Sequence, residues 1–132
     1  MTSSTARAPS SSLKTLAFGL FAGPVMWSIQ ELVSYSLAAQ ACYPGSAPLR
    51  EPLIGGVGVF VALTTLVALV IAIAALLVSL RSWRAAGSVS ELEAPDESRI
   101  RFLSLAGILV SALFILAIAL NGVPVLLLSP CD

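Results

Sequence analysis

Residues 66–78 read LVALVIAIAALLV, an unbroken run of apolar side chains. The run lies inside a longer uncharged segment, 53–80, which exceeds the about 20 residues that a helix needs to cross the hydrocarbon core of a bilayer. It lacks the alternation of apolar and polar residues that is typical of a barrel strand. Because backbone groups in lipid must form hydrogen bonds within their own segment, we expect a transmembrane helix here.

Two further segments have the same character. Residues 15–41 contain one charged side chain, Glu31, and residues 102–128 contain none. Charged residues make up 11% of the chain and hydrophobic residues 58%, whereas an average soluble domain has about 25% charged residues. We therefore expect an all-α membrane protein in which residues 13–132 form a single domain of three transmembrane helices, surrounded by the lipid bilayer.

The composition also excludes several classes of function. The seven basic and seven acidic residues cancel, so no net charge attracts nucleic acid. The chain has no histidine, which removes histidine-ligated haem and the common zinc sites, and we expect no cofactor. Because neither a nucleophile–base pair nor a pair of carboxylates lies within a span, the chain is not expected to be an enzyme.

Basic residues predict the orientation in the membrane. The segments before the first span and between the second and third spans hold six of the seven Lys and Arg residues: Arg7, Lys14, Arg81, Arg84, Arg99 and Arg101. Since cytoplasmic segments carry the excess of basic residues, we expect a flexible cytoplasmic tail at 1–12 and a cytoplasmic loop at 81–101. The first loop and the C-terminus are then outside.

Proline and acidic residues predict where the third helix begins and ends. Pro95 is followed by Asp96 and Glu97, a pattern typical of a helix start because acidic side chains favour the positive end of the helix dipole. Gly122 and Pro124 predict that this helix is interrupted or ends near its outer face.

Small residues at four-residue spacing occur in two of the spans. Gly19 and Gly23 form one pair, and Gly107 and Ser111 form the other. Such pairs let transmembrane helices approach closely. Pro24 predicts a kink in the first helix.

A polar stripe lies in the first span. Glu31 is joined there by Gln30, Ser34 and Tyr35. A charged residue near the middle of a span costs about 2.5–3.5 kcal/mol on insertion scales, so such residues usually face protein or water. The stripe has three interpretations: a proton or cation site, a contact with a larger partner, or a hydrogen bond to a neighbouring helix, with Asn121 of the third span as a possible partner.

The two cysteines, Cys42 and Cys131, lie at the outer ends of the first and third spans in the expected orientation. An oxidising compartment would join them in a disulfide, which we predict. The alternative is a copper(I) site made by two thiolates, which no histidine supports.

A cleaved signal peptide is an alternative interpretation of the first span. Arg7 and Lys14 precede the apolar run, and Ala39-Gln40-Ala41 stands before Cys42. However, the apolar core of a signal peptide has about 7–15 residues, and the run here is about twice as long. We therefore expect the first span to remain in the protein.

Two stretches carry a family resemblance. They comprise GPVMW at 23–27 with Gln30-Glu31, Ser34-Tyr35 and Cys42, and RFL at 101–103 with Gly107, SALF at 111–114, Val123-Pro124 and Pro130-Cys131. In these residues the chain resembles small, mostly uncharacterised bacterial three-span membrane proteins, some of them encoded beside respiratory cytochrome oxidase genes. The resemblance implies an accessory or assembly role near a terminal oxidase, in the inner (plasma) membrane, and carries over no catalytic residue.

Three hypotheses about function follow. The first is a non-catalytic accessory subunit or assembly factor of a larger membrane complex, and the complex we expect is a respiratory terminal oxidase. The second is a small transporter or channel that self-associates and uses Glu31 as a proton or cation site. The third is a copper or thiol carrier based on Cys42 and Cys131. None of the three involves nucleic acid.

Overall fold

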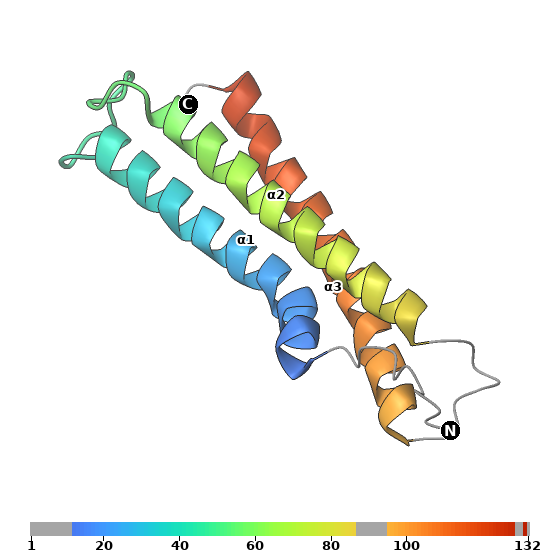
Figure 1. Ribbon diagram of the computed structural model, residues 1–132. Coiled ribbons are helices and arrows are strands. Elements are labelled where there is room, and N and C mark those ends of the chain that lie inside the picture. The colour runs from blue at the N-terminus through green and yellow to red at the C-terminus, as the bar shows by residue number, and fades with distance from the viewer. Residues whose placement is uncertain (1–11, 87–94, 129–130, 132) are drawn as a thin grey trace, which may run out of the picture.

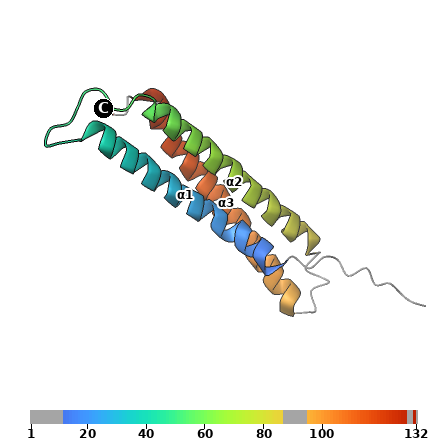
Figure 2. The ribbon, with the colours of Figure 1, turned by 60° about the vertical axis from the view of Figure 1, so that its left-hand side comes forward.

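The computed structural model describes residues 12–86, 95–128 and 131. Three long helices make up the fold: α1 at Leu13–Cys42, α2 at Val57–Ala85 and α3 at Pro95–Leu127. They lie side by side, with α2 running opposite to α1 and α3 (Figures 1 and 2), and each packs against both others. All three contain segments long and apolar enough to cross a membrane, which confirms the predicted all-helical class and its three candidate spans.

The first helix starts almost where the sequence predicts. The side chain of Ser12 accepts a hydrogen bond from the backbone N–H of Thr15, at 3.3 Å. It thereby caps one of the backbone N–H groups of the first turn that have no partner within the helix. The expected flexible tail, 1–12, lies outside the described residues except for Ser12. The helix passes through Pro24 without a break and ends at Cys42, before Pro44.

The bounds of α2 correct the prediction at both ends. The predicted span began at Leu53, but the helix begins at Val57, after Gly55 and Gly56. Gly56 has a φ of 87°, a left-handed conformation that side chains other than glycine rarely adopt. At its other end α2 continues to Ala85, so the first residues of the predicted loop 81–101 are helical. Arg81 and Arg84 are exposed, which is compatible with a helix that extends beyond the hydrocarbon core of a membrane.

The bounds of α3 agree with the sequence at the start and within one residue of the predicted span 102–128 at the end, but the expected interruption is absent. The helix begins at Pro95, as predicted, and it is not interrupted at Gly122 or Pro124. Instead it continues to Leu127, and the backbone N–H of Leu128 donates to the carbonyl of Pro124 at 2.8 Å. A proline this close to the helix end removes only one backbone hydrogen bond, so the last turn still forms.

The helices approach each other closely where the predicted small-residue pairs meet. A Cβ atom added to Gly107 would lie 2.5 Å from Ser79 Oγ and 3.3 Å from the carbonyl oxygen of Gly19, so a side chain at this position would force Ser79 and the backbone of α1 to shift. Ser111 Oγ donates to that same carbonyl at 3.0 Å. One turn further along α1, Gly23 lies against Ser111 and Phe114. The predicted close approach of the two pairs is confirmed, and Ser79 brings α2 into the same contact.

Apolar side chains mostly face away from the interior of the bundle. The core consists largely of small residues, among them the fully buried Ala68, Ala72 and Ala75, with Ile118 as the largest fully buried side chain. Most of the leucines, such as Leu66, are exposed. This arrangement suits a bundle whose solvent is lipid, where close packing of small residues replaces hydrophobic burial as the source of helix association.

We predict that Gly107→Val destabilises the bundle by about 1–3 kcal/mol, because overpacking a tight contact forces side chains and backbone apart. The matched control is Gly58→Val, since a Cβ atom at Gly58 meets nothing within 4 Å. Thermal unfolding in detergent should show a lower melting temperature for the first variant only. Equal melting temperatures for the two variants would contradict the packing described above.

Candidate functional site

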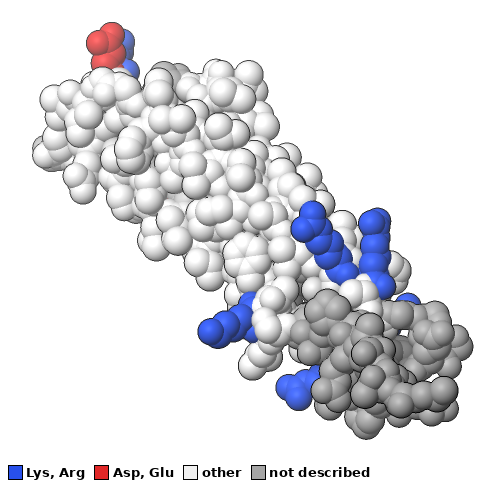
Figure 3. All heavy atoms as spheres, viewed as in Figure 1, with Lys and Arg blue, Asp and Glu red and all other residues white. Residues whose placement is uncertain are grey.

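The two ends of the bundle carry different residues. We call one the basic end, which holds Lys14, Arg81, Arg84, Arg99 and Arg101, and the other the disulfide end, which holds Cys42 and Cys131. Figure 3 shows the basic side chains gathered at one end, with a cation and an acidic side chain at the other. On the face drawn there, the described surface between the ends carries no charged residue. The apolar belt is this middle part of the bundle.

Gln30 connects α1 to α2 inside the apolar belt. Its side chain is only 2% exposed, and its Nε2 donates to Thr65 Oγ1 at 3.0 Å. The Thr65 hydroxyl in turn donates to the carbonyl of Val61 at 2.9 Å. Gln30 Oε1 is buried and has no hydrogen-bond partner among the residues that the structure describes. The buried amide is therefore only half satisfied, which limits what this contact contributes to stability.

Glu31, the next residue, connects α1 to α3. Asn121 Nδ2 donates a hydrogen bond to Glu31 Oε1, so the structure contains the helix–helix contact that was one of the three interpretations of the stripe. Glu31 is half-buried and Asn121 is exposed on the surface of the bundle. At 1.5 Å per residue, Glu31 lies about 16 Å along α1 from Cys42 and so falls well inside the belt. The pair thus places polar atoms on a surface that lipid would otherwise cover.

The predicted stripe divides between two faces of α1. Ser34 is half-buried, and Tyr35 is 77% exposed. Residues four apart on a helix share a face, so Ser34 follows Gln30 on the side toward α2 and Tyr35 follows Glu31 on the side toward α3. The structure brings Glu31 and Asn121 together and leaves Gln30 in a separate contact.

Trp27 lies one turn before Gln30 and Glu31 on α1. Its ring centroid is 5.7 Å from that of Phe114, and it packs against the core of Ala68, Ala72 and Ile118. Its Nε1 is buried without a hydrogen-bond partner. The indole therefore acts through packing, and its polar atom is not used within the bundle.

Thr65 is the contact residue that the sequence analysis missed. It belongs to a buried stripe of small residues on α2, made of Thr65, Ala68, Ala72, Ala75, Ser79 and Ser82. Their spacing of three and four residues places them on one face of a helix. That spacing was visible in the sequence and would have identified the face of α2 that meets Gln30 and the glycines.

A groove of about 250 Å³ lies between α2 and α3 in the half of the belt nearer the disulfide end. Thr65, Ala119 and Gly122 are among the residues that line it, and a Cβ atom on Gly122 would lie 3.0 Å from Thr65 Cγ2. Apart from Thr65 its walls are apolar, and among the residues that line it there is no charged group or nucleophile. The groove therefore has the character of a packing surface.

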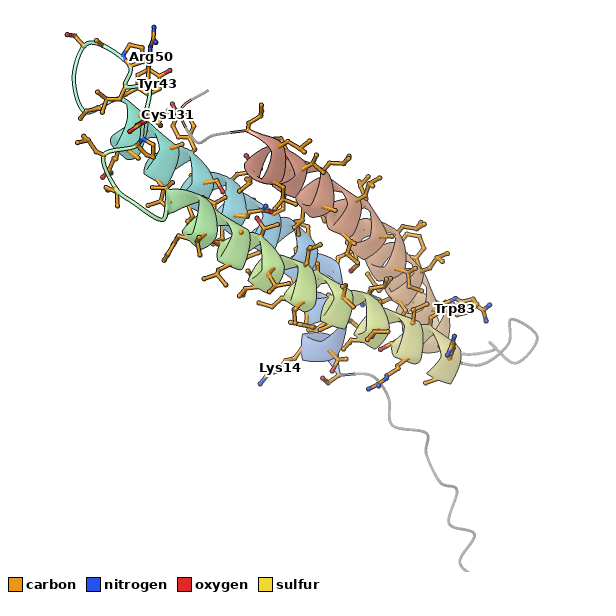
Figure 4. The ribbon with its side chains drawn as sticks, turned by 90° about the horizontal axis from the view of Figure 1, so that it is seen from above. Lys14, Tyr43, Arg50, Trp83 and Cys131 are labelled. Atoms are coloured by element: carbon orange, nitrogen blue, oxygen red, sulfur yellow. A yellow bond between two sulfur atoms is a disulfide. The ribbon has the colours of Figure 1, made fainter. Side chains whose placement is uncertain are left out.

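The disulfide predicted from the sequence is confirmed. Cys42 and Cys131 are bonded, with their Cα atoms 5.4 Å apart and 89 positions apart in the chain. The connection after α1 folds over this end, since the backbone N–H of Leu49 donates to the carbonyl of Cys42 at 2.8 Å and that of Leu53 donates to Ala41 at 3.0 Å. In Figure 4, Cys131 lies at the same end as Tyr43 and Arg50. The bond ties α1 to the end of the chain that follows α3.

An aromatic contact marks the basic end. The guanidinium carbon of Arg101 lies 5.4 Å from the centroid of the Trp83 ring, which links α3 to α2 (Trp83 is labelled in Figure 4). Tryptophan and arginine in this position are typical of the membrane–water interface.

The described residues contain no group of three or more His, Cys, Asp or Glu side chains that could hold a metal ion. What the belt offers chemically is a set of hydrogen-bonding groups: one carboxyl, two carboxamides and several hydroxyls. A comparison of the chain with known protein families, curated proteins and solved structures finds no match.

We predict that the unreduced protein contains no thiol that an alkylating reagent can modify, and that two appear after reduction. Reduction should also lower the melting temperature. A free-chain estimate for a loop of this length is about 4–5 kcal/mol, an upper bound here because the unfolded chain in a membrane is already ordered. Intact mass spectrometry with and without reductant measures the first effect. Two modified thiols before reduction would show that the disulfide is wrong.

We also predict an asymmetry between the two partners of the Gln30–Thr65 contact. Thr65→Val leaves the buried amide nitrogen unpaired and should cost about 1–2 kcal/mol. Gln30→Leu should cost less, because it also removes the unpaired Oε1 and leaves Thr65 bonded to Val61. The double variant should then be more stable than the sum of the two costs implies. Thermal unfolding of the wild type, the two single variants and the double variant measures these costs. If the costs of the single variants add up to that of the double variant within about 0.5 kcal/mol, the two side chains are not coupled and the prediction is wrong.

Proposed function

We propose that this chain is a non-catalytic accessory subunit or assembly factor of a larger membrane complex. The observation that supports this proposal is the Glu31–Asn121 pair, which lies on the surface of the bundle within the apolar belt. Polar side chains in this position usually face protein rather than lipid, because hydrocarbon offers them no hydrogen bonds. A partner protein over this surface would remove that cost.

The rest of the bundle suits a role in packing. Its described residues supply small, tightly packed contacts inside and large apolar side chains outside. Such a surface can lie against the helices of another membrane protein. The resemblance to proteins encoded beside cytochrome oxidase genes makes a respiratory terminal oxidase the complex that we propose, in the inner membrane of a bacterium.

We propose that the basic end faces the cytoplasm and the disulfide end faces outward. The helix ends that carry Lys14, Arg81, Arg84, Arg99 and Arg101 come together at the basic end, whereas Arg50, labelled in Figure 4, lies at the other. The excess of basic residues on the cytoplasmic side of membrane proteins supports this orientation. An outward disulfide also agrees with an oxidising compartment.

We predict that the tagged full-length protein, isolated in mild detergent, is accompanied by terminal-oxidase subunits in near-equal amounts. Mass spectrometry identifies and quantifies them. Glu31→Gln should retain these partners within about twofold, because the amide still accepts the hydrogen bond from Asn121. Gly58→Val serves as a matched control at a site with open space around it.

The opposite outcome favours transport. If the protein is isolated alone as a defined homo-oligomer, and Glu31→Gln abolishes proton or cation flux in proteoliposomes, then the accessory role is wrong. A transporter with Glu31 as its titrating group would take its place, since three short-loop spans make a pathway only by associating with further copies.

A further inference from the structure

Three hydrogen-bonding side chains share the outer surface formed by α1 and α3. They are Glu31 and Tyr35 of α1 and Asn121 of α3, and we call them the outward polar patch. Glu31 and Asn121 are bonded to each other, and Tyr35 follows Glu31 by four residues, about one helical turn nearer the disulfide end. All three lie within α1 or α3 rather than at a helix end.

The patch retains unused hydrogen-bonding capacity. A carboxamide has two N–H donors and an oxygen that accepts two hydrogen bonds. Asn121 uses one N–H on Glu31 and is exposed, and among the described residues its second N–H and its oxygen have no further partner. The Tyr35 hydroxyl is a further donor and acceptor on a side chain that is 77% exposed. The patch therefore needs both a donor and an acceptor from whatever covers it.

This requirement separates classes of partner. Lipid chains provide neither donor nor acceptor, and Lys or Arg provides donors only. Serine, threonine, asparagine and glutamine side chains provide both, and they form hydrogen bonds between transmembrane helices. A neutral polar side chain therefore matches the patch, whereas a cation leaves the second N–H of Asn121 unpaired.

A second copy of the chain matches the patch less well. Copies inserted in the same orientation are related by an axis along the membrane normal, which brings equivalent residues to the same depth. A contact between the two patches would then bring the two Glu31 carboxyls near each other at one depth. Two carboxyl groups repel each other when both are ionised.

We propose that the outward polar patch binds a transmembrane helix of the larger partner, and that this helix carries a hydroxyl or carboxamide side chain at the depth of Asn121. The inference rests on the proposed function and specifies its contact surface and the chemistry of its partner. The helix lies along α1 and α3, so α2 contributes nothing to the contact.

Site-specific photo-crosslinking of the full-length protein in its native membrane tests this surface. A benzophenone amino acid is placed at Leu120, which is exposed beside Asn121, and in a separate variant at Val70, which is exposed on α2. We expect a single defined crosslinked protein from position 120 and at most a trace from position 70. A crosslink between two copies of this chain, or equal yields from both positions, would overturn the proposal.

Substitutions then test the chemistry. Asn121→Leu and Glu31→Leu should each lower the yield from position 120 by roughly threefold to tenfold, the range expected for losing one interhelical hydrogen bond. Glu31→Gln should leave it within about twofold, because a neutral partner accommodates the amide. Val70→Leu is the matched control for an apolar change. Melting temperature and the intact disulfide are measured for each variant, and only variants within a few degrees of wild type are compared.

The outcomes separate this inference from the proposed function. Oxidase subunits could accompany the protein while the crosslink is unaffected by Asn121→Leu and Glu31→Leu. The outward polar patch is then not the binding surface, but the proposed accessory role still holds. If the crosslink depends on the patch but the crosslinked partner is not a respiratory protein, the patch is the binding surface and the oxidase assignment is wrong. A large loss with Glu31→Gln would overturn the neutral partner and indicate a basic side chain.

Discussion

Gly107, Gly19 and Ser79 bring the three helices so close together that a single added carbon atom does not fit. In water, burial of large apolar side chains could hold a bundle together at wider spacing, but in lipid that driving force is absent. Association then depends on van der Waals contact at short range and on a few hydrogen bonds, such as that from Ser111 to the carbonyl of Gly19. The small residues of the interior and the leucines of the surface both follow from this constraint, as does the position of each helix relative to the others.

The polar side chains of the belt depend on the same contact. With the helix axes fixed by the glycines, Gln30 meets Thr65 on one neighbour and Glu31 meets Asn121 on the other. Each contact connects α1 to a different helix, so the adjacent polar residues serve two separate interfaces. The second interface opens onto the bundle surface, which is why Glu31 and Asn121, rather than the buried Gln30, are the side chains that a partner can reach.

Much of this fold was predictable, for reasons that particular residues make clear. Uncharged runs predicted three membrane helices, the GxxxG-type pairs predicted a close approach of helices, and two cysteines at the ends of parallel spans predicted the disulfide. The start of α2 was not predicted, because hydropathy gives no information about the left-handed backbone conformation of Gly56. The uninterrupted α3 was not predicted either, because a proline in the last turn costs little. The site was predicted as one stripe, since i to i+4 spacing describes a single helix, and only the positions of α2 and α3 show that Gln30 and Glu31 face different neighbours.

The two halves of the bundle differ in how closely α2 and α3 pack, and this difference bears on where a partner can bind. Toward the basic end, the contacts of Gly19, Gly107 and Ser79 leave no room between the helices. Toward the disulfide end, the groove between α2 and α3 remains open, the Glu31–Asn121 pair lies at the surface, and a covalent bond ties α1 to the chain end. This end is also packed, since Ala41, Cys42, Val57 and Val61 form a buried cluster around the disulfide. The polar pair on α1 and α3 and the groove between α2 and α3 therefore lie between two closely packed regions, which hold the helices in place while this part of the surface stays available to a partner.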